Sequence, residues 1–234
     1  MRASPTVDPG EGVMLVGDRL LQPDHRPVDR SDVSTAVQYR VKRLIDIVVA
    51  LAVLVLLSPL LLVIALLIRL TSPGPALYRQ RRLRTLDQEF TMYKFRTMVD
   101  GAEGLVHELL ELNQASGPLF KVRSDPRRTP VGRVLRRCFL DELPQFINVL
   151  KGEMSLVGPR PCLSSEAAGR ADLLAFRFHV PQGITGPWQT SGHHGITFED
   201  QLLVEIDYIE NWSLARDVSI ILRTIPLVLR RSGI

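Results

Sequence analysis

Residues 47–68 read IVVALAVLVLLSPLLLVIALLI, a run of 22 residues without a charge, and this run organises the chain. One straight helix of that length would extend about 33 Å, close to the thickness of the hydrocarbon core of a bilayer. Pro59 removes the hydrogen bond to the carbonyl of Val55 and bends or breaks the helix near its middle, and the Ser58 hydroxyl can partly replace that bond. Each half would be about 17 Å long, too short to cross the core alone.

The charges at both ends of the run bear on its topology. Lys42 and Arg43 precede it, and Arg69 and several arginines between 79 and 84 follow it. Positively charged flanks stay on the cytoplasmic side, so both ends are expected there, which a re-entrant helix-break-helix permits and a straight span does not. The pattern favours re-entrant insertion, with a straight span and a buried helix of a soluble protein as the alternatives.

The rest of the chain divides around this run. We expect a mobile polar tail at 1–39, the re-entrant membrane helix and its turn at 40–75, and a cytosolic domain at 76–234 that contains a strand at 90–95. The predicted fold class is α+β: a helix-break-helix anchor joined to a mainly helical domain with a small β element. Helices of that domain are expected near 101–115, 142–151, 199–211 and 215–231.

Composition excludes several classes of protein. With 45% hydrophobic residues the chain is not a long disordered protein, and two widely separated cysteines form neither a disulfide framework nor a zinc site. Of the net charge of +4, residues 76–140 contribute 13 − 7 = +6. This positively charged segment could bind anionic lipid or phosphorylated small molecules. Because it has few aromatic residues and no helix-turn-helix motif, nucleic acid is not expected as a partner. The apolar, arginine-containing stretch 218–231 could pack on a second copy, as in a homo-oligomer, or lie on lipid.

Two adjacent acids stand at the head of a predicted helix. Residues 136–152 read RRCFLDELPQFINVLKG, in which Asp141 is a good N-cap and Gly152 a good terminator, so a helix is predicted over 142–151. The positive end of that helix would favour the ionised form of Asp141 and Glu142. An ionised carboxylate can act as a nucleophile toward phosphorus or as a ligand of a hard divalent cation. Ordinary helix capping is the alternative for the pair taken alone.

Cations suited to phosphate surround this pair in the sequence. In the segment KFRTM at 94–98, Lys94 and Arg96 would project from the same face of a strand, so that both could meet one anion. Several arginines between 123 and 136 lead up to the acids, and the turn SLVGPRP at 155–161 fixes Arg160. These residue types together indicate a site that handles phosphate.

As an ordered set, these motifs resemble those of the bacterial sugar transferases, the small monotopic phosphoglycosyl transferases that initiate glycan assembly on a polyprenol carrier. The resemblance covers about residues 40–234. The segments that carry it are KRLID at 42–46, SP at 58–59, PGP at 73–75, KFRTM at 94–98, DPR at 125–127, LDELPQ at 140–145, SLVGPRP at 155–161 and GITGPWQ at 183–189.

This resemblance implies a membrane enzyme of glycoconjugate or exopolysaccharide biosynthesis. It would transfer a sugar-1-phosphate from a UDP-sugar to polyprenyl (undecaprenyl) phosphate and release UMP, at the cytosolic side of the bacterial inner (cytoplasmic) membrane. Asp141 would be the nucleophile of a phosphosugar-aspartyl intermediate, and Glu142, with Asp141, would bind Mg2+. A nonenzymatic, membrane-anchored scaffold that binds anionic lipid is the alternative. Substrate-binding side chains are expected at Lys94, Arg96, Arg136, Arg160 and Gln189.

The chain departs from the family pattern at three places. Arg84 and Asp87 stand where the family has glycine in a turn, and Cys138 and Phe139 replace small hydroxyl residues before the acids. At 193–194 the chain has two histidines where the family has arginine, so the charge of that position depends on pH. The spacing of the motifs leaves the identity of the sugar open.

Overall fold

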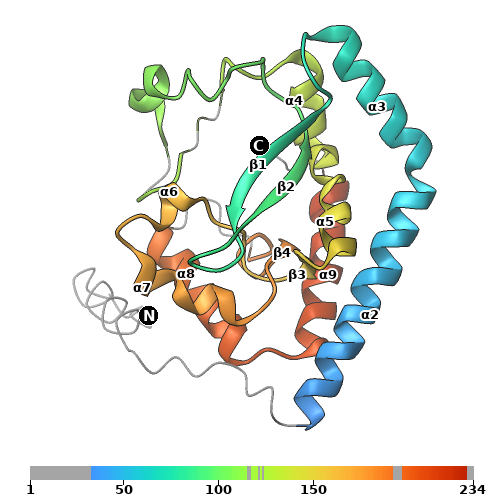
Figure 1. Ribbon diagram of the computed structural model, residues 1–234, viewed down its shortest axis with the longest axis vertical. Helices are drawn as coiled ribbons and strands as arrows, with labels where there is room; N and C mark the ends of the chain where they lie inside the picture. Colours follow the sequence, from blue (N-terminus) through green and yellow to red (C-terminus); the bar gives the residue numbers. More distant parts are fainter. Residues whose placement is uncertain (1–32, 115–116, 121, 123, 192–196, 231–234) are drawn as a thin grey trace, which may run out of the picture.

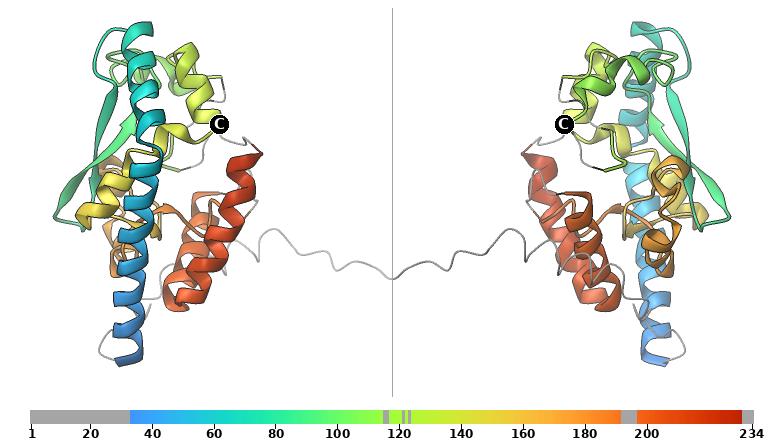
Figure 2. Two further views of the ribbon diagram at one scale, coloured as in Figure 1. Left: turned by 90° about the vertical axis from the view of Figure 1, so that its right-hand side faces the viewer. Right: turned by 90° about the vertical axis from the view of Figure 1, so that its left-hand side faces the viewer.

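The computed structural model describes residues 33–114, 117–120, 122, 124–191 and 197–230 (Figure 1). Within them the fold is mostly helical with two small sheets. Two long helices, α2 (Val33–Leu56) and α3 (Ser58–Thr71), run along one side of the molecule, and the other elements lie together on the inner side of this pair (Figures 1 and 2). The helix α2 begins within the range expected for the tail, and residues 1–32 of that tail lie outside the described residues.

The predicted break at Ser58 and Pro59 is confirmed. The axes of α2 and α3 are bent by 62° at this point, and the Ser58 hydroxyl donates a 2.8 Å hydrogen bond to the carbonyl of Val55, which has lost its usual donor to Pro59. No single helix of the described residues is long and apolar enough to cross a bilayer, whereas α2 and α3 together pass that test as a bent pair.

In helix α2 charged side chains are buried and many large apolar side chains are exposed, the reverse of a helix in a soluble protein. Its buried side chains include Lys42 and Asp46 with Ala50, which recur every four residues and form a stripe that faces the rest of the fold. An exposed apolar surface of this size is typical of contact with lipid rather than water. Large exposed apolar side chains of α2 and α3 include Val48, Leu51, Val55, Leu62, Val63, Leu66 and Leu70.

A β-hairpin follows the bent pair, and the strand expected at 90–95 is its second strand. Strands β1 (Leu77–Leu83) and β2 (Glu89–Phe95) are antiparallel, with Leu77 opposite Phe95. The connecting turn closes without glycine, since the amide of Arg84 donates a 2.7 Å hydrogen bond to the carbonyl of Gln88. The residues at 84 and 87 that depart from the family pattern therefore still permit a short turn.

The second sheet pairs β3 (Ser155–Val157) with β4 (Gly183–Thr185) in parallel. The two strands approach so closely that a Cβ atom at Gly158 would overlap the carbonyl oxygen of Pro181, and one at Gly186 would overlap that of Gly158. Glycine is therefore required where the two loops that leave this sheet meet. The main hydrophobic core surrounds β3 and contains Val149, Met154, Val157, Leu202 and Ile206.

Two of the remaining helix predictions, at 199–211 and 215–231, are confirmed by α8 (Phe198–Glu210) and α9 (Leu214–Leu229), and residue 231 lies outside the described residues. The described residues of the helix expected at 101–115, which are 101–114, contain only a short 3-10 helix, and the helix expected at 142–151 begins three residues late, at Gln145. The remaining elements are η1 (His107–Leu112), α4 (Pro130–Arg137), η2 (Leu140–Glu142), α5 (Gln145–Lys151), α6 (Ser164–Ala167), α7 (Ala171–Leu174), η3 (Ala175–His179), α8 (Phe198–Glu210) and α9 (Leu214–Leu229).

Candidate active site

The acidic pair, Asp141 and Glu142, lies in a 3-10 turn rather than at the head of a helix. Both residues belong to η2, and α5 starts at Gln145 after Pro144. The expectation that Asp141 caps a helix is therefore wrong: the chain completes a separate turn before the α-helix begins. The predicted end of the helix is confirmed, because Gly152 takes the left-handed conformation at φ 77°.

The turn is entered through an unusual backbone conformation. Phe139 has φ 57°, and it is the only residue other than glycine with positive φ among the described residues. A bulky side chain is disfavoured there, and such strain persists only where the surrounding structure fixes it. The departure from small residues at 138–139 therefore coincides with the point where the chain turns from α4 into the acidic pair.

The two carboxyls of the pair have opposite pKa shifts. Burial and, next, the negative charge of Glu142 raise the pKa of Asp141, against the opposing effects of Lys94 and Arg136. Burial also opposes ionisation of Glu142, but Lys94 outweighs it, assisted by Arg160 and Arg136, and the pKa of Glu142 is lowered. The contact responsible is direct: Lys94 Nζ donates a 2.8 Å hydrogen bond to Glu142 Oε1. Glu142 is thus the anion of a fixed ion pair, and Asp141 is a buried carboxyl that forms no ion pair with any of the described residues.

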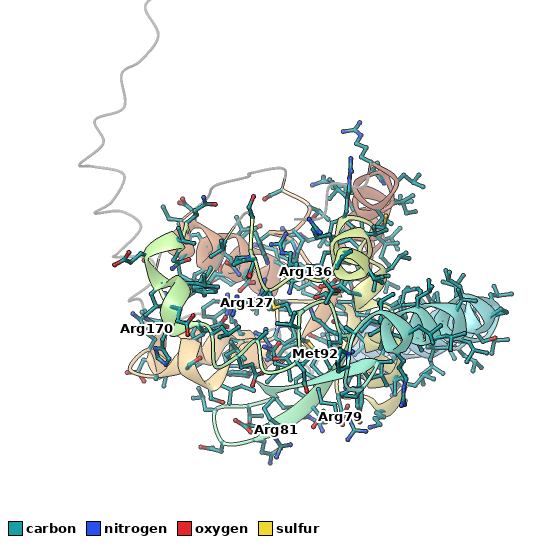
Figure 3. All side chains as sticks on the ribbon, turned by 90° about the horizontal axis from the view of Figure 1, so that it is seen from above. Arg79, Arg81, Met92, Arg127, Arg136 and Arg170 are labelled. Carbon is teal, nitrogen blue, oxygen red and sulfur yellow. The ribbon has the colours of Figure 1, made fainter. Side chains whose placement is uncertain are left out.

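Arg136 is positioned by close packing of α4 on the segment after β2. A Cβ atom at Gly132 would overlap the carbonyl oxygen of Thr97, so only glycine lets the helix approach this closely. In that position Arg136 Nε donates a 2.9 Å hydrogen bond to Thr97 Oγ1. Figure 3 shows Arg136 toward the middle of the molecule, whereas Arg79 and Arg81 lie on the outer side of the hairpin.

Arg160 is held by a buried ion pair that the sequence did not reveal. The amide of Arg160 donates to Glu205 Oε1 at 3.4 Å, and Glu205 is fully buried against Arg177, whose Nε lies 2.5 Å from its Oε2. Glu205 belongs to α8 and is 45 residues from Arg160 along the chain. No local sequence pattern links Glu205 to Arg160. The one available signal was an acidic residue on the apolar face of an amphipathic helix, which indicates a buried carboxylate that needs a partner.

The structure gives Arg96 a different environment from Lys94. Its guanidinium donates to the carbonyl of Pro73 and, at 2.9 Å from Nη2, to that of Ser72, so Arg96 clamps the turn after α3. The two cations therefore do not meet at one protein anion, because the strand β2 ends at Phe95, before Arg96.

Gln189, the other expected substrate contact, lies in the loop after β4. Its Oε1 lies against Gly186 and is buried without a hydrogen-bond partner among the described residues. The expectation for residues 193–194 lies outside the described residues.

The stripe on α2 connects the bent helix pair to the elements that carry the site. Lys42 Nζ donates to the carbonyl of Val157 at 2.9 Å, and Arg43 Nη1 donates to that of Val149 at 2.6 Å. Asp46 Oδ1 accepts from the amide of Leu156 at 3.0 Å. The helix α2 thus fixes the end of α5, which follows the acidic pair, and the strand β3, which leads to Arg160. The spacing KRxxD at 42–46 was visible in the sequence, but its partners were not.

The acidic pair suits a metal ion that is shared with a substrate. No group of three or more His, Cys, Asp or Glu side chains able to hold a metal occurs in the described residues. Mg2+ usually binds one or two carboxylates and completes its octahedron with water and substrate phosphate oxygens. Asp141 and Glu142 supply that number of hard oxygen ligands, and Lys94, Arg136 and Arg160 lie within electrostatic reach for phosphate. The residues present therefore fit Mg2+ bound together with a phosphate.

Comparison with known proteins gives a consistent result. Residues 37–231 match the family model described as bacterial sugar transferase. The chain is 40% identical over 201 residues to the undecaprenyl-phosphate galactose phosphotransferase of Salmonella typhimurium, a match that covers 82% of this chain and 41% of that protein. It is 37% identical to the exopolysaccharide production protein ExoY of Sinorhizobium fredii, over 82% of this chain and 87% of that protein. It is also 42% identical to the UDP-glucose:undecaprenyl-phosphate glucose-1-phosphate transferase of Caulobacter vibrioides, over 80% and 69% of the two chains.

The chain thus spans about two fifths of the Salmonella relative and most of the ExoY protein. The matched residues include the bent helix pair, the acidic pair and the cations around it. A family model that covers most of a chain, with relatives at this identity across most of its length, establishes membership. The chain belongs to the bacterial sugar transferase family.

Proposed function

We propose that this chain transfers a sugar-1-phosphate from a UDP-sugar to undecaprenyl phosphate. The observation that carries the proposal is a buried carboxyl, Asp141, that lies beside Glu142 in the field of Lys94, Arg136 and Arg160. The names of the relatives agree on the lipid acceptor but differ in the sugar, which is galactose, glucose or N-acetylgalactosamine. The donor sugar of this chain therefore has to be measured.

In the first half of the proposed reaction, Asp141 is the nucleophile. An oxygen of its carboxylate attacks the phosphorus that bears the sugar, a new Asp–O–P bond forms, and the bond from that phosphorus to the bridging oxygen breaks. UMP leaves with the bridging oxygen and its electron pair, and the sugar phosphate remains on Asp141. Lys94, Arg136 and Arg160 would neutralise the charge that develops on the phosphate oxygens.

In the second half, an oxygen of undecaprenyl phosphate attacks the same phosphorus. The Asp–O–P bond breaks, the carboxylate of Asp141 is restored, and the sugar is left on a lipid diphosphate. Glu142 remains ionised throughout because its ion pair with Lys94 lowers its pKa. Bound Mg2+ would supply further charge neutralisation at the phosphates, with Glu142 and Asp141 as its protein ligands.

The lipid acceptor requires a site at the level of the phosphate headgroups. We propose that α2 and α3 enter the membrane as a re-entrant pair from the cytoplasmic side, supported by the 62° bend and by the exposed apolar side chains on both helices. In this arrangement residues 40–75 form the anchor in the cytoplasmic membrane, residues 76–234 form the catalytic domain on the cytosolic side, and residues 1–39 precede them. The bend would keep both ends of the pair beside the catalytic domain.

The chemistry is tested with purified protein in detergent or nanodiscs. Incubation with Mg2+ and each of several UDP-sugars, without lipid, should leave a sugar phosphate on Asp141, detected by intact-protein mass spectrometry and peptide mapping. Addition of undecaprenyl phosphate should remove the adduct and release lipid-linked sugar. Asp141→Asn should abolish both steps while membrane binding is retained, and Asp172→Asn, at an exposed aspartate, is the matched control. Full turnover by Asp141→Asn would overturn the proposal and favour a scaffold.

The topology is tested by labelling single cysteines in a variant that lacks Cys138 and Cys162. Cysteines at residue 30 and at the exposed position of Asp87 should both react from the cytoplasmic side. Reaction from opposite sides of the bilayer would contradict re-entrant insertion.

A further inference from the structure

The segment before α4 brings another arginine to the edge of the candidate site. Arg128 forms an isolated antiparallel bridge with Met98, and the flanking amide of Thr129 donates to the carbonyl of Thr97 at 3.0 Å. Thr97 is the residue whose hydroxyl accepts from Arg136. Arg128 and Arg136 therefore both attach to the short segment at 97–98 that follows β2.

The preceding residue, Arg127, is an arginine whose hydrogen bonds are all made within the protein. Arg127 is buried, and its Nε and Nη2 donate to the carboxylate of Asp125 at 2.9 and 2.6 Å, while Nη1 donates to the carbonyl of Ala102. Each of its nitrogens has a protein acceptor. Its position toward the middle of the molecule is visible in Figure 3.

Arg128 is less buried and less completely paired than Arg127. It is half-buried, and no carboxylate of the described residues forms an ion pair with it. Its Nη2 donates to the carbonyl of Val122 at 3.0 Å, and its Nε is buried without a hydrogen-bond partner among the described residues. A guanidinium that is partly desolvated and incompletely paired is an arrangement that favours binding of an anion from outside the protein.

Arg128 also lies in the electrostatic field of Asp141. Burial and, next, the positive charge of Arg136 lower the pKa of Arg128, and Asp125 and Asp141 act in the opposite direction. Asp125 is already paired with Arg127, so Arg128 adds a positive charge near Asp141 to the three cations that act on the acidic pair, and these four cations exceed the two carboxylates by two charges. A phosphate group carries a charge that would match this surplus. The four cations are Lys94, Arg128, Arg136 and Arg160.

We propose that Arg128 is a further phosphate-binding residue of this active site and contacts a phosphate group of one of the two substrates. The inference rests on the proposed function. The phosphate comes either from the diphosphate of the donor or from the monophosphate of the lipid acceptor, and a guanidinium can hold either through two parallel hydrogen bonds. Arg128 takes the place that the sequence had assigned to Arg96, whose guanidinium holds a turn instead.

The test is steady-state kinetics of Arg128→Gln with both substrates varied. A lost charged hydrogen bond predicts a rise of about 10- to 100-fold in the KM of one substrate. A rise for the UDP-sugar, with a matching slowing of adduct formation in the absence of lipid, assigns the residue to the donor. A rise for undecaprenyl phosphate, with adduct formation unchanged, assigns it to the acceptor. The matched control is Arg137→Gln, at an exposed arginine of α4, which should leave both KM values unchanged.

Other outcomes would overturn the inference. If the wild-type enzyme turns over and Arg128→Gln leaves both KM values unchanged, Arg128 does not bind substrate. If kcat and the melting temperature fall while both KM values stay constant, its role is only to hold the carbonyl of Val122. Should the glutamine variant fold poorly, Arg128→Lys decides the question: it keeps the charge but loses the two-pronged geometry, and must raise the same KM by a smaller factor. A wild-type enzyme without turnover would instead contradict the proposed function.

Discussion

The ion pair between Lys42 and Asp217 should be among the most sensitive points of the fold. Lys42 Nζ lies 2.5 Å from Asp217 Oδ2, and the two residues are 4% and 3% exposed. In Lys42→Met the carboxylate of Asp217 stays buried and keeps, among the described residues, its contacts with Tyr208 and Trp212. The carbonyl of Val157 loses the 2.9 Å hydrogen bond from Lys42 and keeps the 3.5 Å one from the Tyr208 hydroxyl. Removing one partner of a buried pair costs about 3–5 kcal/mol, so the variant should lose that much of its free energy of unfolding.

The assay is urea denaturation of the detergent-solubilised protein, followed by tryptophan fluorescence, because Trp212 contacts Asp217. Arg40→Met, at an exposed residue of the same helix, is the control and should change the free energy by less than about 0.5 kcal/mol. The double variant Lys42→Met/Asp217→Asn removes both charges and should be more stable than Lys42→Met alone. A loss below about 1 kcal/mol in the single variant, or no recovery in the double variant, would show that the pair is solvated and that the reasoning is wrong.

Three further predictions concern the site. Asp141→Asn should raise the melting temperature at neutral pH, because the pKa of Asp141 is raised in the folded protein, so that its carboxylate destabilises the fold above that pKa and this destabilisation disappears as the pH falls through the pKa. Thermal unfolding of both proteins at pH 7 and at acidic pH measures the effect, and a lower melting temperature of the variant at pH 7 would contradict the prediction. Lys94→Met should move the acid limb of the pH–activity profile to higher pH, because the positive charge that acts to lower the pKa of both Asp141 and Glu142 is gone. The variant should also reduce kcat/KM at neutral pH about 10- to 100-fold. An acid limb that does not shift would count against the proposed role of the acidic pair. Gly132→Ala should destabilise the protein by about 1–3 kcal/mol and reduce activity, because its Cβ atom would overlap the carbonyl oxygen of Thr97 and displace α4 with Arg136. Gly104→Ala, whose Cβ atom would only come into ordinary contact with the carbonyl oxygen of Gly101 at 3.5 Å, should be nearly silent in the same denaturation assay.

Local patterns in the sequence were sufficient where a single residue determines the backbone. The Ser58–Pro59 break, the strand ending at Phe95 and the helix end at Gly152 follow from proline, alternation and glycine, and the structure confirms each. The sequence also singled out the acidic pair, because two acids before an apolar helix stand out among arginines, and its catalytic role stays a prediction. These features involve interactions between residues only a few positions apart.

The predictions failed where contacts between distant segments decide the outcome. The helix α5 starts late because η2 packs beside β2, and Arg96 turns to the Ser72–Pro73 carbonyls because the hairpin ends next to the turn after α3. Nothing within a few residues of Arg160 indicates that Glu205 holds its backbone. The same limit applies to Arg127 and Arg128, because the sequence does not show that, among the described residues, only Arg127 has a carboxylate partner.

The polar stripe of α2 has a practical consequence for anyone who wants a water-soluble form of this enzyme. Deleting the apolar helices α2 and α3 would also delete Lys42, Arg43 and Asp46, whose side chains form hydrogen bonds with the backbone of α5 and of β3 on either side of the candidate site. A truncated protein should therefore be inactive even when supplied with a short-chain acceptor that needs no bilayer. The workable route is to keep every helix and exchange outward-facing leucines, such as Leu51, Leu62 and Leu66, for glutamate or lysine.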